Sequence, residues 1–152
     1  MRAVIQRVTR AELEVSGAVL SSIERGLLVY VAVGVDEPAD AAEKLAEKVV
    51  NLRIFDDEAG KLNLSVRDVR GGVLAVPNFT LMADASKGRR PAFAAAAPAK
   101  LAEARYDAFT EALRRYEIPV AGGSFGSHMI IRSDADGPVN ILVAIPPIGG
   151  SE

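Results

Sequence analysis

The chain has 152 residues, of which 49% are hydrophobic and 25% are charged, and its formal net charge is −2. This length predicts a single domain, residues 1–152, with enough apolar residues for a packed core, and the charge balance argues against disorder and against a uniformly basic nucleic-acid binder. The chain has no cysteine and one histidine, which excludes disulfides, thiol nucleophiles and cysteine-based metal sites, and leaves His128 as the only candidate for a serine triad.

The first part of the chain predicts strands and no membrane segment. The opening "MRAVIQRVTR" has no apolar signal region, and no apolar run approaches the roughly 18 residues that a membrane span requires, so we expect a cytoplasmic protein. One strand is expected to start at Met1, and in the stretch "AELEVS" Ala11, Leu13 and Val15 alternate with polar residues, which indicates one buried face. The apolar, glycine-bounded run 26–34 is typical of a strand that is buried on both faces.

Two helices are predicted from the spacing of apolar residues. The first follows Asp36, which we expect to be its N-cap, and it has Pro38 in its first turn. The second ends shortly before Pro119. The faces expected to be buried are Ala42, Leu45, Val49 and Leu52 in the first helix, and Leu101, Ala104, Ala108, Phe109, Ala112, Leu113 and Tyr116 in the second.

The remaining segments predict further strands. The run 71–79 is expected to be a short buried strand that ends at Pro77, because proline cannot donate to a sheet ladder. Two final strands, about 125–132 and 139–145, are joined by the turn-like stretch "SDADGPVNIL". Strands outnumber helices and short turns join most of them. This predicts an α+β domain whose mainly antiparallel sheet is rolled toward a barrel, with two helices and sheet surface that a homodimer could cover.

The stretch "VPNFTLMAD" places polar residues where a buried strand meets a loop, which is a common position for functional sites. One interpretation is a strand that frays into a turn, with Thr80 capping a backbone group. The other is that the backbone N–H groups of Asn78, Phe79 and Thr80 point into a pocket and bind a developing oxyanion.

The stretch "SKGRRP" is the densest basic cluster of an acidic chain, with Lys87, Arg89 and Arg90. Such a run is either a solvated surface or a loop that contacts phosphate beside the pocket.

The stretch "DGPVN" contains Gly137 and Pro138. A bond before proline prefers the trans form by only about 0.5–1 kcal/mol, so the cis form is accessible if the fold holds it. The pair is either a trans hairpin turn or a cis pair whose two carbonyls point to the same side. His128 is interpreted as a surface or packing residue rather than a catalyst.

Together these segments resemble the D-aminoacyl-tRNA deacylases, historically called D-tyrosyl-tRNA deacylases. Family-like blocks follow in the expected order along nearly the whole chain: "MRAVIQRV", "GLLVYVAVG", "LRIFDDEAGKLNLSV", "PNFTL", "KGRRPAF", "FGSHM" and "DGPVN". The resemblance implies a homodimeric α/β domain, without metal or cofactor, that cleaves the ester between a D-amino acid and the terminal adenosine of tRNA.

The resemblance also implies roles for individual residues. Phe79 and Thr80 match a Phe-Thr pair whose backbone amides face the scissile carbonyl. Gly137 and Pro138 match a Gly-cis-Pro pair that is inserted across the dimer interface into the partner subunit's pocket. Their carbonyls would occupy the place that an L side chain needs.

Further positions complete the expected site. Arg7 matches a family arginine that helps to fix the orientation of the Gly-Pro pair, and Met129 matches a residue near the pocket. The basic loop is then expected to contact tRNA through Lys87, Arg89 and Arg90.

The chain departs from the family pattern at four positions. Pro77 and Asn78 stand where the family usually has Ser-Gln, Ala135 stands in place of asparagine, and Asn140 in place of threonine. Chemistry through the serine hydroxyl would be impaired here, whereas chemistry through backbone amides would lose nothing essential. The scarcity of catalytic side chains favours the backbone version.

The expected activity is hydrolysis of D-aminoacyl-tRNA by backbone oxyanion stabilisation, assisted by the 2′-OH of the tRNA ribose. If L-amino acids are rejected because their side chains do not fit, glycine is not rejected, because it has no side chain. Glycyl-tRNA, including glycine mischarged on tRNA-Ala, is therefore expected to be cleaved as well. Two alternatives stay open because of Pro77 and Asn78. One is a non-catalytic tRNA- or aminoacyl-binding module, and the other is a deacylase of shifted specificity.

Overall fold

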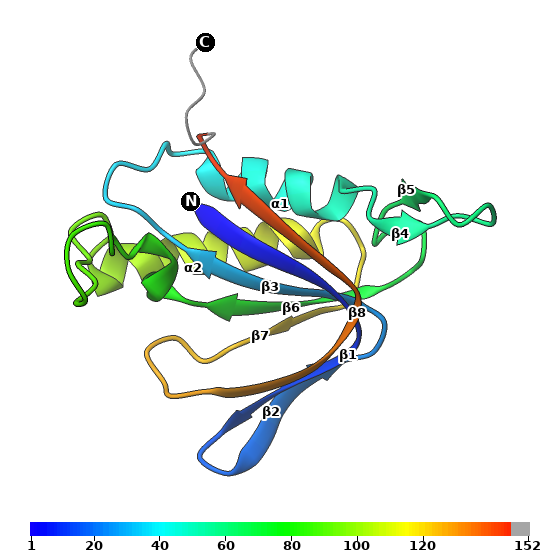
Figure 1. Ribbon diagram of the computed structural model, residues 1–152, viewed down its shortest axis with the longest axis horizontal. Helices are drawn as coiled ribbons and strands as arrows, with labels where there is room; N and C mark the ends of the chain where they lie inside the picture. The colour runs from blue at the N-terminus through cyan, green and yellow to red at the C-terminus, as the bar shows by residue number, and fades with distance from the viewer. Residues whose placement is uncertain (147–152) are drawn as a thin grey trace.

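The sheet is organised around one long strand, β1 (Arg2–Val15), which pairs with three others. In the computed structural model, which describes residues 1–146, β1 is antiparallel to β2 (Ala18–Ile23) and β3 (Gly26–Ala32), and also to β8 (Ile130–Ala144) (Figure 1). Ala11 and Leu13 of β1 are almost inaccessible to solvent, which confirms the predicted alternation.

Two parallel pairs extend the sheet beyond β3. Strand β3 is parallel to β6 (Gly72–Pro77), and β6 is parallel to β7 (Val120–Gly122). Every residue of β3 except Tyr30 is buried, which confirms the prediction of a strand covered on both faces. The strands approach closely at Gly26, where an added Cβ would lie 1.9 Å from the carbonyl oxygen of Gly72.

Two helices cover one side of this sheet (Figure 1). They are α1 (Ala41–Asn51) and α2 (Ala99–Arg114), and both supply buried side chains to the larger core cluster. A second, smaller cluster of buried side chains includes Val8 and Leu13 of β1 and Leu74 of β6. The predicted α+β class with two helices and a barrel-like sheet is therefore confirmed. Neither helix in the described range is long and apolar enough to cross a membrane.

Three short elements complete the described chain. The strands β4 (Phe55–Asp56) and β5 (Leu62–Leu64) form a small separate hairpin after α1. A 3-10 helix, η1 (Phe79–Met82), follows β6 directly. The hairpin matters because Asp56 of β4 lies beside Arg7, and η1 matters because it contains Phe79 and Thr80.

Helix α1 begins later than predicted, because its N-cap is Asp40 rather than Asp36. The segment before it is held as a turn by Glu37, whose Oε1 accepts a hydrogen bond from the Gly34 N–H at 2.6 Å and whose Oε2 binds the Met1 amino group. The predicted inner face is otherwise confirmed: Ala42, Leu45 and Val49 are buried, and Leu52 lies half-buried just past the helix end.

The inner face of α2 is rotated relative to the prediction. Leu101, Ala104 and Ala108 are exposed, which corrects their assignment to the core. The cause is Tyr106, whose hydroxyl donates to the Ala75 carbonyl at 2.9 Å and accepts from the Gly123 N–H at 3.0 Å. The buried face consists of Ala102, Tyr106, Phe109, Thr110, Ala112 and Leu113.

The two predicted final strands are in fact one strand, β8, because both halves pair with β1. The predicted hairpin turn between them is a bulge: Gln6 pairs with Asn140 and Val8 with Ala135, so residues 136–139 oppose a single residue of β1. The Gly137–Pro138 bond is cis, so the interpretation as a trans hairpin turn is wrong.

Candidate active site

A cavity of about 690 Å³ opens where β3 and β6 end. Its walls are residues 30–33, residues 76–80, the first half of α2, the loop 125–129 and Ile131 of β8. Because β3 and β6 are parallel, their carboxyl ends meet at one edge of the sheet, which is where parallel strands commonly present ligand sites. Four of the predicted site residues line this cavity, namely Asn78, Phe79, Thr80 and Met129.

Asn78 holds the segment that leaves β6. The strand ends at Pro77 as predicted, and the Asn78 N–H then donates to the Val31 carbonyl at 2.8 Å. The Asn78 side-chain oxygen accepts the Thr80 N–H at 3.3 Å and also binds the Thr80 hydroxyl, so it caps η1. The local consequence of asparagine at this position is an ordered turn beside the cavity.

The backbone donors of this turn are fewer than expected. The Asn78 N–H is used in the sheet, which corrects the expectation that three amides face the pocket. Within residues 1–146, the Phe79 N–H has no hydrogen-bond partner. The Thr80 N–H makes only the 3.3 Å contact with Asn78, which is long for an N–H···O bond. The amides of Phe79 and Thr80 are therefore the candidates for binding an oxyanion.

Tyr30 and Tyr106 also line the cavity, although the sequence patterns do not identify them as site residues. Burial raises the pKa of Tyr106 and the pKa of Tyr30, so both side chains are neutral hydroxyls at physiological pH. Tyr30 carries a signal in the sequence, since it is the one residue with a polar tip in the otherwise aliphatic run 26–34. Tyr106 could be predicted as a buried residue near the cavity only if the buried face of α2 had been assigned correctly.

The single histidine lies on the wall of the cavity but is exposed. Within the described range, His128 makes no hydrogen bond or ion pair with Thr80. The exposure of His128 agrees with its interpretation as a surface residue.

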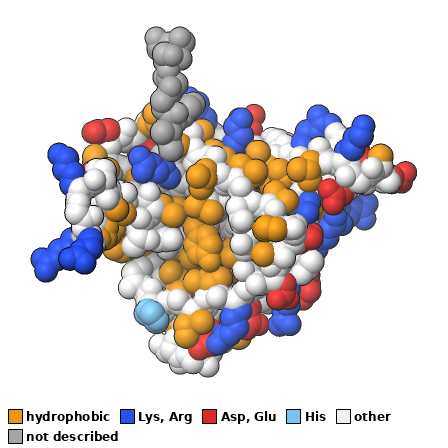
Figure 2. All heavy atoms as spheres, viewed as in Figure 1, with side chains coloured by type: hydrophobic (Ala, Val, Ile, Leu, Met, Phe, Trp, Pro, Cys, Tyr) orange, Lys and Arg blue, Asp and Glu red, His pale blue; other side chains and the backbone are white. Residues whose placement is uncertain are grey.

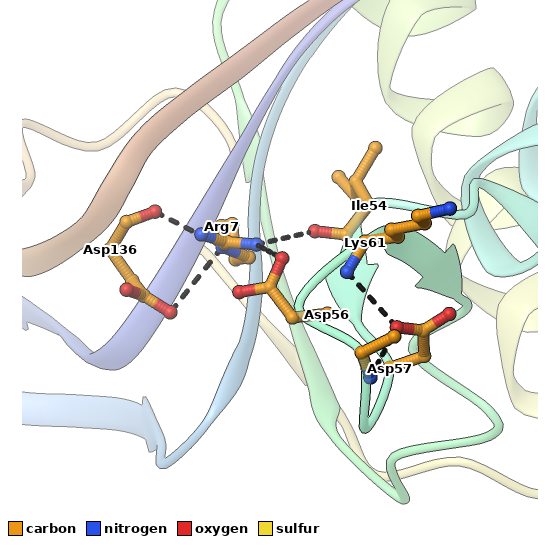
Figure 3. A network of polar contacts seen from close by, with 7 residues as sticks. Arg7, Ile54, Asp56, Asp57, Lys61 and Asp136 are labelled. Atoms are coloured by element: carbon orange, nitrogen blue, oxygen red, sulfur yellow. Dashed lines mark hydrogen bonds and ion pairs between the residues drawn. The ribbon is translucent and has the colours of Figure 1, made fainter.

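Arg7 lies at the centre of a polar network that joins three parts of the chain (Figure 3). It is only 6% exposed, and its guanidinium donates to the Asp136 carbonyl at 3.1 Å and to the Ile54 carbonyl at 2.9 Å. The carboxylates of Asp136 and Asp56 lie 3.3 and 3.6 Å from it. Arg7 therefore holds the backbone immediately before Gly137 and fastens it to the hairpin β4–β5.

The predicted residues fall into three groups in the folded chain: the cavity lining, the Gly137–Pro138 region with Arg7, and the basic loop. Gly137 and Pro138 are exposed on β8, and neither they nor Arg7 line the cavity of their own chain. The insertion of the Gly-Pro pair into a partner subunit's pocket therefore stays a prediction.

The basic cluster forms the tip of the loop 84–92, with Lys87, Arg89 and Arg90 all exposed. This green loop projects at the left of Figure 1, where Figure 2 shows blue side chains reaching into solvent. At its base, Ser86 donates to Asp84 through its N–H at 2.9 Å, and the Ser86 side chain and N–H lower the pKa of that carboxyl.

Comparison with known proteins supplies the family context for this geometry. The sequence model of the family described as D-Tyr-tRNA(Tyr) deacylase matches residues 4–144. A D-aminoacyl-tRNA deacylase of Deinococcus radiodurans is 50% identical over 145 residues, which cover 95% of this chain and 100% of the relative. One of Thermosipho africanus is 48% identical, covering 94% of this chain and 96% of the relative.

Solved structures agree with the fold. The "c-Myc DNA Unwinding Element Binding Protein" superposes with a TM-score of 0.89 at 39% identity, covering 95% of this chain and 98% of that chain. A "probable eukaryotic D-amino acid tRNA deacylase" superposes with a TM-score of 0.83 at 20% identity, covering 93% and 97%, and that likeness concerns the fold alone.

Proposed function

Because the chain belongs to the D-Tyr-tRNA(Tyr) deacylase family, and is thereby a D-aminoacyl-tRNA deacylase, we propose that it hydrolyses its substrate with the backbone amides after β6. The aminoacyl end of tRNA enters the cavity, and the carbonyl oxygen of the ester points at the Phe79 and Thr80 N–H groups. Water adds to the carbonyl carbon, the bond to the ribose oxygen breaks, and that oxygen takes up a proton. The free amino acid and tRNA are the products.

The observation that carries this proposal is that, within residues 1–146, the N–H of the cavity-lining residue Phe79 has no hydrogen-bond partner. A preorganised donor of this kind lowers the barrier by very roughly 3 kcal/mol when it meets the oxyanion. The ester is already activated, so this modest catalysis suffices, and the 2′-OH of the substrate ribose assists the proton transfer. Thr80 acts as an orienting residue and not as a covalent nucleophile, since within residues 1–146 its hydroxyl is bonded to the Asn78 side-chain oxygen and to no basic side chain.

Selectivity for D-amino acids is proposed to come from exclusion. The carbonyls of Gly137 and Pro138 would enter the cavity of a second subunit and fill the space of an L side chain. Three observations support this arrangement: the pair is exposed, it lies away from its own chain's cavity, and Arg7 holds the preceding carbonyl.

A homodimer is proposed because the exclusion mechanism needs a second subunit and because the chain has surface that a second subunit would cover. Strand β8 is paired with β1 alone in the described chain, and its Ile130 and Leu142 are 43% and 75% exposed. Apolar side chains also gather in the middle of the face shown in Figure 2. An unpaired strand edge and exposed apolar area are features that a second subunit would cover.

The activity is tested by comparing three labelled substrates. Purified protein is expected to release the amino acid from D-Tyr-tRNA and from glycyl-tRNA charged on tRNA-Ala, and to leave L-Tyr-tRNA intact. Rapid hydrolysis of L-Tyr-tRNA would refute selection by exclusion. Binding of D-Tyr-tRNA without release would instead identify a non-catalytic binding module.

The backbone mechanism makes a separate prediction for Thr80→Ala. The substitution removes the hydroxyl that binds Asn78 but keeps both amide donors, so kcat is expected to stay within about tenfold of the wild-type value. Single-turnover hydrolysis of D-Tyr-tRNA measures this, with the melting temperature as a check on folding. Complete loss of activity in a folded variant would assign the chemistry to the side chain.

A further inference from the structure

Two exposed aromatic side chains meet at the rim of the cavity. Phe79 is 58% exposed and Phe93 is 37% exposed, and their ring centroids lie 5.1 Å apart in an edge-to-face arrangement. Phe79 also lines the cavity itself. Large aromatic side chains are usually buried, so an exposed pair beside a ligand-sized cavity indicates surface that a bound molecule covers.

The position of Phe93 is set by the backbone around it. Asp84 and Ala92 exchange two backbone hydrogen bonds of 2.8 and 2.9 Å, which close the loop 84–92 directly before Phe93. On the other side, the Ala96 N–H donates to the Phe93 carbonyl at 3.0 Å. The ring is therefore presented at the rim by a fixed loop, in advance of any ligand.

The same loop carries positive charge that is not paired with acidic side chains in the described part of the chain. Residues 85–92 include Lys87, Arg89 and Arg90 and no acidic residue. In the part of the chain that the structure describes, none of these three cations forms an ion pair. Cations of this kind contact the phosphates of nucleic acids.

We propose that Phe79 and Phe93 form a stacking site for an unpaired base of the tRNA 3′ end, next to the terminal nucleotide, with the loop cations on the adjoining phosphates. This inference rests on the proposed function, because tRNA is the ligand. Exposed aromatic rings beside basic side chains are what proteins use to bind single-stranded nucleic acid. The site accepts any base, because stacking uses the face of the base and not its edge.

Kinetics on two substrates of different length test the site. For D-Tyr-tRNA, Phe93→Ala is expected to raise KM at least about fivefold and to change kcat less than twofold, because the ring binds a base that does not react. For D-tyrosyl-adenosine, which lacks the neighbouring nucleotides, the same variant keeps the wild-type KM. Phe93→Tyr keeps a ring and is expected to restore the KM for D-Tyr-tRNA.

A matched control and a binding measurement complete the test. Leu101→Ala removes an apolar side chain of similar exposure, 38%, outside the cavity lining, and is expected to leave both KM values unchanged. In binding assays with uncharged RNA hairpins, wild-type protein prefers an acceptor stem with its unpaired 3′ nucleotides over the blunt stem. Phe93→Ala reduces this preference at least about threefold.

The outcomes separate this inference from the proposed function. The stacking site would be overturned if Phe93→Ala changed the KM for both substrates equally, or changed neither. It would also be overturned if the variant changed the oligomeric mass of the protein while tRNA binding stayed the same. If wild-type protein binds the hairpins with the Phe93-dependent preference but hydrolyses neither substrate, the proposed function fails while the stacking site stands.

Discussion

Replacing Arg7 by lysine is expected to lower the selectivity for D-Tyr-tRNA over L-Tyr-tRNA at least about tenfold. The guanidinium donates to two carbonyls, those of Asp136 and Ile54, which lie in different parts of the chain. One ammonium cannot keep both bonds in this geometry, so the backbone before Gly137 loses its anchor. The tenfold change in selectivity corresponds to about 1.4 kcal/mol, which is within the range for one lost hydrogen bond to a charged group.

The same substitution is expected to cost about 1–3 kcal/mol of stability, because a buried carbonyl is left without its donor. The ion pairs with Asp136 and Asp56 add little, since both carboxylates are about half exposed. The measurements are the ratio of kcat/KM for the two tRNAs and a urea unfolding curve. Arg10→Lys, on the same strand but exposed, is the control and should change neither. A folded Arg7→Lys protein with unchanged selectivity would remove Arg7 from the positioning of the Gly-Pro pair.

Gly26→Ala is expected to be the most damaging substitution for stability, with a loss of at least about 3 kcal/mol. The added Cβ would lie 1.9 Å from the Gly72 carbonyl oxygen and 2.8 Å from the carbonyl carbon. These atoms belong to the backbone of the neighbouring strand and cannot rotate away, so β3 and β6 must separate. Because the cavity opens at the far ends of the same two strands, hydrolysis of D-Tyr-tRNA should fall as well.

Gly60→Ala is the matched control for this experiment. An added Cβ at Gly60 meets nothing within 4 Å, but its φ of +72° disfavours alanine, so only a loss of about 1–2 kcal/mol is expected. Thermal unfolding of the two variants measures the difference. Equal melting temperatures would show that the β3–β6 contact relaxes without cost.

Much of the sheet can be predicted from local patterns, because its strands alternate or are continuously apolar. Ala11 and Leu13 are buried where the alternation puts them, and Pro77 ends its strand. The start of α1 and the face of α2 cannot be predicted this way, because contacts distant in sequence decide them. Glu37 holds the segment before α1, and the hydroxyl of Tyr106 turns α2 toward β6 and β7.

The site shows the same division. Family-like motifs identify Asn78, Phe79 and Thr80, and the structure brings them to one cavity. That the Asn78 N–H is already bound follows only from the pairing of β3 with β6. The bulge in β8 is equally invisible in sequence, since "SDADGPVNIL" has the composition of a turn and only the partner strand reveals that the chain continues in the same direction.

The pairing of β1 with β8 also determines when the contact between Arg7 and Asp136 can form during synthesis. Arg2 pairs with Ala144, so the edge of β1 that faces β8 stays unpaired until the last described strand is available. Such distant pairings form late and slowly. Arg7 can reach the Asp136 carbonyl only after nearly all of the described chain has left the ribosome, whereas the turn at Phe79 and Thr80 rests on contacts that are complete much earlier.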